Sequence, residues 1–191
     1  MKRDLDKTRT ALLDAAEKLM SECDDPDEVT ARAITREAGV NLAMINYCFG
    51  SREALLYVVF SRIQREALMI DPGLGEVMKS ELSPKEILAE LHFRTMKLML
   101  TNFKYCKALT KYILVTRKIG DRRTSVQFIQ QHYGGRKNEG ECRLIAFELS
   151  GIHELAVLRH EEIRDICGID LMNDDVLKKY VYNNIDRMLG D

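Results

Sequence analysis

Apolar residues recur every three or four positions along almost the whole chain, which is the period of a helix with one buried face. The first such face consists of Leu12, Leu13, Ala16, Leu19 and Met20. The 191 residues include only 3 Pro and 11 Gly, too few for the frequent turns of a β-sandwich or β-barrel. The sequence therefore predicts an all-α fold.

Three short helices are predicted after the first, and each has a recognisable start. Thr30, Asn41 and Ser51 stand where a side-chain oxygen can accept a hydrogen bond from an unpaired amide of the first turn, so we expect them to be N-caps. The first two of these helices should end at Gly39 and Gly50, because the left-handed conformation at a helix C-terminus favours glycine.

The clearest break in the pattern is the segment 71–75, Asp-Pro-Gly-Leu-Gly, which we expect to be a loop at a domain boundary. The next helix begins at Ser83, which forms a capping box with Glu86 and has Pro84 at its first helical position. Further helices are predicted at about 103–118, 123–133, 141–167 and 174–189.

Residues 30–53 have the layout of a helix-turn-helix, in which two short helices are joined by a tight turn containing glycine. In that motif the second helix lies in the major groove of DNA. The residues expected to bury together and fix the angle between the helices are Ile34, Ala38, Val40, Ile45 and Phe49. Spacing alone leaves open an αα-corner inside some other helical protein.

The second helix of the motif would present a non-acidic surface to its surroundings. The residues on its outer side are Leu42, Ala43, Met44, Asn46 and Tyr47. Arg32, Arg36 and Arg52 flank this surface and are candidates for phosphate contacts. The net charge of −1 excludes a globally basic protein, but it leaves room for a local basic face.

From Leu12 to Val59 the sequence resembles the TetR family of bacterial transcriptional regulators. The motifs that carry the resemblance are Leu13-x-Ala15-Ala16-x-x-Leu19, Thr30-x-Arg32-x-Ile34-x-x-x-Ala38-Gly39-Val40-Asn41 and Ile45-Asn46-Tyr47-Cys48-Phe49-Gly50-Ser51-Arg52-Glu53-x-Leu55-Leu56. The resemblance implies an all-α homodimer of nine-helix subunits. It also implies a helix-turn-helix domain at residues 1–50, a fourth helix as linker at about 51–70, and an effector-binding and dimerisation domain at 71–191.

The resemblance also implies roles for individual residues. Thr30, Tyr47 and Arg52 would touch phosphates, and Arg32 would reach a phosphate or a base edge. The positions that usually face bases are occupied by Leu42, Ala43 and Met44, and Asn46 stands where many members have a phosphate-contacting tyrosine. Three residues depart from the family pattern, namely Met44 in place of threonine, Cys48 in place of histidine or tyrosine, and Thr35 in place of alanine.

Predictions for the C-terminal half rest on apolar patterning. The residues proposed to line an effector pocket are Met96, Met99, Phe103, Tyr112 and His153, although the same residues would also suit a plain core. Two apolar faces, within 144–156 and 176–189, are expected to pair with a second copy of the chain. The residues expected at that dimer interface are Ile152, Leu155, Tyr180 and Ile185.

Other classes of function find less support in the sequence. His153 and His160 are about 10.5 Å apart along a helix, which is long for a shared metal, and the five cysteines form no Cys-x-x-Cys motif. We expect no metal, no cofactor and no catalytic residue. The start of the chain lacks the apolar stretch of a signal peptide, and no uncharged run approaches the ~20 residues of a membrane span.

The sequence thus predicts a cytoplasmic one-component regulator, more specifically a repressor that a small molecule releases from an inverted-repeat operator. The alternatives are an all-helical enzyme or a protein-interaction module with an incidental helix-turn-helix.

Overall fold

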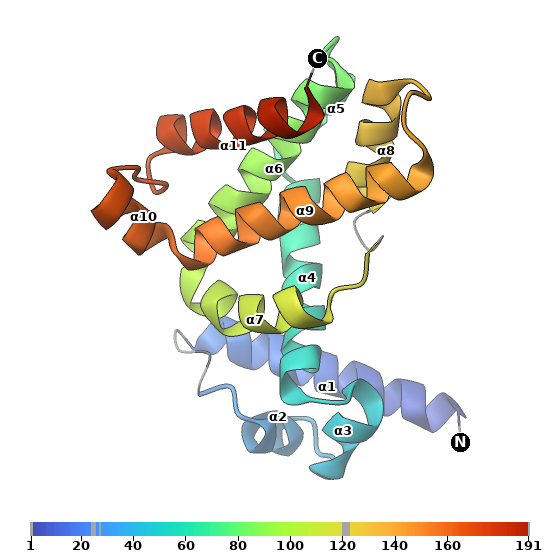
Figure 1. The fold of residues 1–191 in the computed structure, drawn as a ribbon. Helices are drawn as coiled ribbons and strands as arrows, with labels where there is room; N and C mark the ends of the chain where they lie inside the picture. Colours follow the sequence, from blue (N-terminus) through green and yellow to red (C-terminus); the bar gives the residue numbers. More distant parts are fainter. Residues whose placement is uncertain (1, 24–25, 27, 120–122, 191) are drawn as a thin grey trace. The chain divides into compact units, whose positions relative to one another are not determined.

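The computed structural model describes residues 2–23, 26, 28–119 and 123–190, and all the regular structure in these residues is α-helical (Figure 1). The helices are α1 (Lys2–Glu22), α2 (Ala31–Glu37), α3 (Ala43–Phe49), α4 (Arg52–Met69), α5 (Pro72–Lys79), α6 (Pro84–Thr101), α7 (Phe103–Thr116), α8 (Arg123–Tyr133), α9 (Glu139–Leu158), α10 (His160–Cys167) and α11 (Asp174–Leu189). The all-α prediction is confirmed, with two more helices in this part of the chain than the nine expected.

Two differences account for the higher number of helices. The segment expected to be a loop at 71–75 begins α5, because Asp71 accepts a hydrogen bond from the amide of Gly73 and Pro72 occupies the first helical position. The single helix expected at 141–167 is divided at Arg159, where the backbone turns out of helical geometry between α9 and α10. The start signals at Thr30, Ser51 and Ser83 are confirmed, and Ser83 forms the predicted capping box with Glu86.

The chain forms two compact units, Met1–Glu66 with Lys104–Ile113, and Ala67–Phe103 with Leu114–Asp191. The seam after residue 66 lies close to the boundary predicted at residue 71. The difference is the segment Lys104–Ile113 of α7, which belongs to the first unit although it is distant in sequence.

The core of the first unit is built from the inner faces of α1 to α4. Leu12, Ile34 and Leu55 are each 0% exposed. Tyr105 ties α7 into this unit, because its hydroxyl lies 3.0 Å from the carbonyl oxygen of Met20 and 2.5 Å from that of Cys23. It thereby donates to backbone oxygens at the C-terminal end of α1, where helical partners run out.

The second unit packs α6 against α8, α9 and α11. Its core is apolar, but Glu90 on α6 is also buried and is compensated by several partners. Lys178 lies 2.5 Å from one carboxylate oxygen, the Tyr182 hydroxyl donates to the same oxygen over 2.8 Å, and Arg94 lies 3.6 Å from the other. Burial and the Glu90 carboxylate both raise the pKa of Tyr182, so the phenol stays a donor at neutral pH. This cluster links α6 to α11.

The helices in the described part of the chain fall short of what a membrane span requires. None of those helices combines sufficient length with sufficient apolarity to cross a bilayer.

Candidate nucleic-acid interface

The two helices of the motif are set by local hydrogen bonds that the sequence predicted. The Thr30 hydroxyl accepts from the amide of Ala33 over 3.1 Å, and Gly39 has a φ of 65°, the left-handed value expected at the turn. Asn41 accepts from the amide of Ala43 over 2.9 Å, and α3 therefore begins at Ala43. The start is one residue later than the sequence suggested.

Burial separates the inner and outer sides of α3. Ile45 is 2% exposed and belongs to the core of the unit, and it is the one residue of α3 that is fully buried. On the other side Leu42 is 46% exposed and Tyr47 is 71% exposed. The remaining outer residues follow the prediction in part, since Ala43 and Asn46 are exposed and Met44 is half-buried.

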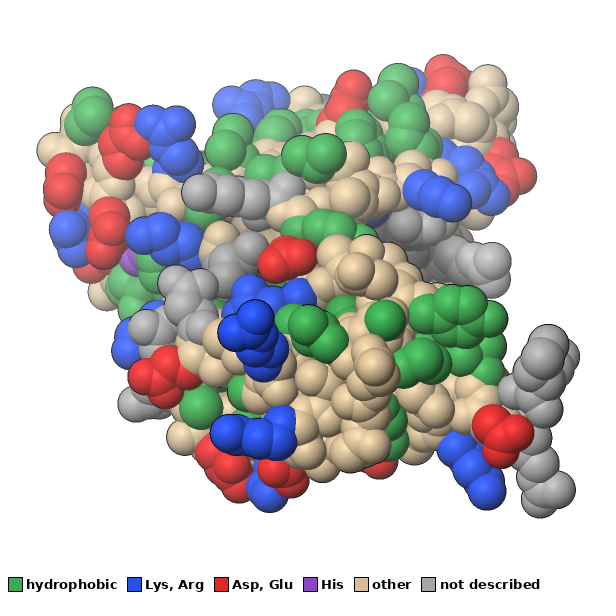
Figure 2. All heavy atoms as spheres, turned by 90° about the horizontal axis from the view of Figure 1, so that it is seen from below, with side chains coloured by type: hydrophobic (Ala, Val, Ile, Leu, Met, Phe, Trp, Pro, Cys, Tyr) green, Lys and Arg blue, Asp and Glu red, His purple; other side chains and the backbone are tan. Residues whose placement is uncertain are grey.

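The outer surface combines apolar and basic groups. Arg32 and Arg36 on the neighbouring helix α2 are exposed. Figure 2 shows Lys and Arg side chains interspersed with hydrophobic ones on the side of the molecule seen from below. A surface of this kind offers cations for phosphates and apolar groups for base edges, which are the two classes of contact that DNA binding requires.

Arg52 has a role that the sequence did not indicate. Its side chain is 22% exposed, its Nε donates to the carbonyl oxygen of Val29 over 2.6 Å, and its Nη2 donates to that of Pro26. Its Nη1 lies 3.5 Å from the Glu53 carboxylate. Because all three nitrogens are engaged inside the unit, Arg52 holds the segment before α2 against the start of α4. This arrangement differs from the phosphate contact that the resemblance implied.

The structure shows the hydrogen-bond partners of two other side chains in the first unit, those of Thr35 and Arg9. Thr35 is 5% exposed, and its hydroxyl donates to the carbonyl oxygen of Ala31 over 2.9 Å, so the position tolerates threonine without leaving a polar group unpaired. Arg9 on α1 was not singled out from the sequence. Its Nη1 donates to the carbonyl oxygen of Cys48 over 2.5 Å, at the end of α3.

The predicted effector residues are not all brought together. Met96, Met99 and His153 are buried in the second unit, and Phe103 is half-buried there with its ring centre 4.3 Å from that of His160. Tyr112 belongs to the first unit instead, where its ring centre lies 6.0 Å from that of Tyr57. Tyr112 thus falls outside the unit that holds the other four predicted pocket residues, because α7 contributes residues to both units.

His153 has polar neighbours inside the second unit. Its Nδ1 lies 2.8 Å from Nδ1 of His92, and the Nε2 of His92 lies 3.3 Å from the hydroxyl of Ser125. Burial lowers the pKa of His153 from 6.5 to about 4, so the ring is neutral at physiological pH. The contact between the two Nδ1 atoms is then a hydrogen bond in which one ring nitrogen donates and the other accepts. Nε2 of His153 is buried and has no hydrogen-bond partner within the described structure.

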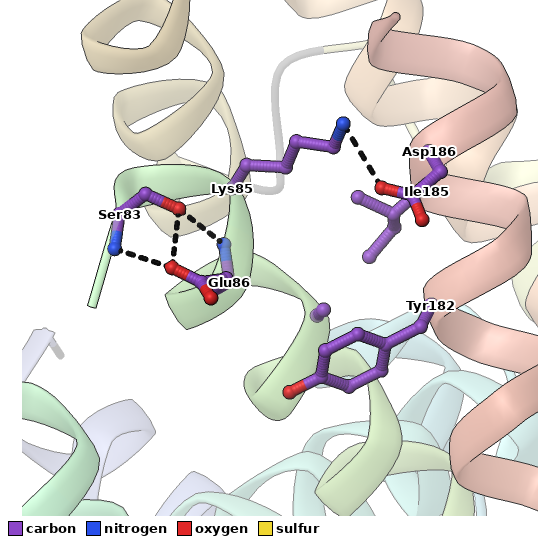
Figure 3. A pocket seen from close by; sticks show the side chains of 7 residues that line it. Ser83, Lys85, Glu86, Tyr182, Ile185 and Asp186 are labelled. Carbon is purple, nitrogen blue, oxygen red and sulfur yellow. Dashed lines mark hydrogen bonds and ion pairs between the residues drawn. The ribbon is translucent and has the colours of Figure 1, made fainter. Parts of the chain in front are cut away.

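A shallow cavity of about 350 Å³ lies elsewhere in the second unit, between the start of α6 and the end of α11 (Figure 3). Its lining is Ser83, Lys85, Glu86, Ala89, Tyr182, Ile185 and Asp186. None of the predicted effector residues lines it, and its charged groups are paired with each other or with the backbone, as Lys85 is with Asp186 at 2.9 Å. In the described parts of the chain, no group of three or more His, Cys, Asp or Glu residues is arranged to hold a metal ion.

The predicted dimer residues differ in exposure. Ile152 and Leu155 on α9 are 36% and 49% exposed, and Tyr180 on α11 is half-buried. Ile185 is 1% exposed, so its side chain belongs to the core of the second unit and is not available to a partner. The prediction was wrong at this position because the sequence pattern does not distinguish the inner edge of α11 from its outer edge.

Comparisons with known proteins bear on the first unit. Residues 12–58 match the family described as bacterial regulatory proteins, tetR family. This match confirms the resemblance inferred from the motifs. No curated protein matches the chain. A similar solved structure is that of a TetR-like transcriptional regulator from Rhodococcus sp. RHA1, with 20% identity, a TM-score of 0.49, and coverage of 96% of this chain and 97% of that chain.

The position of Arg52 predicts a loss of stability in the first unit when this residue is removed. Arg52→Ala should lower the free energy of opening of α2 by about 2 kcal/mol, since two backbone carbonyls lose a charged donor. The measurement is amide hydrogen exchange over Ala31–Glu37 in the full chain. The control is Arg65→Ala, which removes an exposed cation from α4, the helix that also carries Arg52. Equal exchange in both variants would contradict the assignment.

The burial of His153 predicts an acid-sensitive stability. The unfolded ring takes up a proton below pH 6.5 and the folded ring only near pH 4, so stability falls as the pH drops between these values. At pH 5 the loss from this residue amounts to about 2 kcal/mol. Urea unfolding at pH 7.5 and 5.0 should show a smaller loss in His153→Gln than in the wild type, and equal losses would refute the prediction.

Proposed function

Because the chain belongs to the TetR family of bacterial regulatory proteins by its residues 12–58, we propose that it is a repressor that binds an inverted-repeat operator as a homodimer. Membership of this family makes it a DNA-binding transcriptional regulator. We expect it to act in the cytoplasm and to be released from DNA by a small molecule. Regulators of this family are generally not enzymes, and we propose no catalytic residue.

The observation that carries the proposal is the outer surface of α3. Tyr47 and Leu42 are exposed together at a short helix whose opposite side is anchored in the core. Neighbouring exposed apolar side chains of this kind are typical of a binding surface. Inserted in a major groove, Leu42, Ala43 and Met44 would meet base edges, with apolar contacts to thymine methyl groups. Thr30, Arg32, Asn46 and Tyr47 would lie toward the phosphates on either side.

Dimerisation is supported by the exposed surface of α9. Leu144, Ile152 and Leu155 are 47%, 36% and 49% exposed and recur at intervals that put them on one side of the helix. Gly151 beside them permits close approach of a second helix. Tyr180 on α11 is the candidate to extend this surface. A two-fold dimer built here would present two copies of α3 to half-sites on one side of the duplex.

The effector is proposed to bind inside the second unit. Met96, Met99, Phe103 and His153 combine apolar side chains with a buried imidazole, which is the composition of many small-molecule sites. The unpartnered Nε2 of His153 is the polar group in this set that an effector hydroxyl or carbonyl would satisfy. We therefore expect an effector that is largely apolar and carries few polar groups.

Two substitutions should separate the classes of DNA contact. Arg32→Ala should weaken binding to all duplexes and flatten the dependence of log K on log salt by about 1 per subunit, as loss of a phosphate contact does. Met44→Ala should leave the salt dependence unchanged and relax the preference at one base pair per half-site, by about 1 kcal/mol. The measurement is a mobility-shift titration at several salt concentrations.

Operator DNA for that titration comes from selection of a random duplex library with the wild-type protein. Lys79→Ala removes an exposed cation from α5 and serves as the control, with unchanged affinity and salt dependence expected. If neither Arg32→Ala nor Met44→Ala altered affinity or sequence preference, α2 and α3 would not be the reading surface.

The dimer surface predicts a specific response to added charge. Ile152→Glu should produce monomers and weaken operator binding strongly, because a carboxylate would be buried without a partner in the proposed interface. Ile166→Glu on α10 is the matched control, since Ile166 is 75% exposed and lies outside that surface. The measurement is the oligomeric state of both variants, determined by sedimentation at micromolar concentration. A wild-type monomer, or a dimeric Ile152→Glu, would overturn the proposed interface.

A further inference from the structure

The recognition helix α3 lacks the features that usually stabilise the end of a helix. It has seven residues, too few for stability in isolation, and no basic residue in its last turn. The last carbonyl groups of a helix carry a partial negative charge and lack helical partners, so a cation near them is stabilising. In α3 that cation must come from another part of the chain.

Arg9, in the N-terminal half of α1, supplies this cation. Its Nη1 donates a hydrogen bond of 2.5 Å to the carbonyl oxygen of Cys48. The central carbon of the guanidinium also lies 4.2 Å from the ring centre of Phe49, within the range of a cation–π contact. Cys48 and Phe49 are the last two residues of α3, so a single side chain engages this end of the helix by two different interactions.

The geometry of α3 makes this contact more important than an ordinary surface bond. Ile45 is its one fully buried residue, and a helix held at one point remains able to tilt about that point. Asn41 fixes the amide of Ala43 at the start, and Gly50, with a φ of 83°, leads the chain away at the end. Arg9 contacts the C-terminal end of α3 from α1.

We propose that Arg9 is a positioning residue for DNA recognition, which sets the direction of α3 without itself contacting DNA. The inference rests on the proposed DNA-reading function of α3. It assigns to Arg9 a role opposite to the one suggested by its charge and exposure, which is a phosphate contact. The two roles differ in measurable ways, because a phosphate contact acts on all sequences and on the salt dependence, whereas the direction of α3 acts on sequence preference.

The test uses the full chain with Arg9→Gln, Arg9→Lys and the control Lys7→Gln, which removes a neighbouring exposed cation from α1. For Arg9→Gln we expect affinity for selected operator DNA to fall about tenfold. We expect affinity for a scrambled duplex to change less than twofold and the slope of log K against log salt to change by less than about 0.3 per subunit. Arg9→Lys should recover only part of the loss, because an ammonium group has no planar face for the Phe49 ring.

Amide hydrogen exchange gives a readout that does not depend on the operator, and a double mutant tests the contact with Phe49. Amide hydrogen exchange over Ala43–Phe49 should accelerate about tenfold in Arg9→Gln, while exchange over Ala31–Glu37 should stay unchanged. Phe49→Leu removes the aromatic face and keeps an apolar side chain. Adding Arg9→Gln to Phe49→Leu should therefore cost less operator affinity than Arg9→Gln costs in the wild type.

Each alternative has its own signature. A salt slope that flattens by about 1 per subunit, with equal loss on operator and scrambled DNA, would make Arg9 a phosphate contact and overturn the inference. Unchanged operator affinity in Arg9→Gln, or faster exchange throughout the first unit, would also overturn it. Failure of the wild-type protein to bind any duplex would instead refute the proposed function, and this inference with it.

Discussion

A helix of seven residues such as α3 buries too little surface to determine its own direction, and the first unit is organised around this constraint. Ile45 anchors α3 in the core, Asn41 fixes its first amide, and Arg9 donates to the carbonyl oxygen of Cys48 near its end. The left-handed turn at Gly39 sets its approach from α2. With the inner side held in this way, Leu42 and Tyr47 remain exposed on the surface. An exposed apolar patch is typical of a surface that binds a partner.

The backbone around α2 and at the end of α1 depends on side chains from distant parts of the sequence. Arg52 from α4 donates to the carbonyl oxygens of Pro26 and Val29, and Tyr105 from α7 donates to those of Met20 and Cys23. Carbonyl groups at the end of a helix and in the connection that follows have no helical N–H partner. The side chains of Arg52 and Tyr105 donate the hydrogen bonds that these carbonyl groups would otherwise lack. This explains why part of α7 belongs to the first unit and why an arginine at the start of α4 serves structure.

Local signals were readable from the sequence, and long-range ones were not. Thr30, Gly39 and Ser83 act within a few residues of their own position, so caps and turns could be predicted from them. The start of α5 carried an equally clear signal in Asp71 and Pro72, which the neighbouring glycines obscured. The inward position of Ile185, the attachment of Tyr112 to the first unit and the internal role of Arg52 depend on which helices pack together. An amphipathic pattern defines a buried side but not its partner.

The central claim is that paired copies of α3 read one side of a DNA duplex, and hydroxyl-radical footprinting on a duplex selected by the wild-type protein tests it most directly. The account predicts two protected half-sites, related as an inverted repeat and centred about one helical turn apart or a multiple of it. Protection of a single site without two-fold symmetry, or uniform protection independent of sequence, would contradict it.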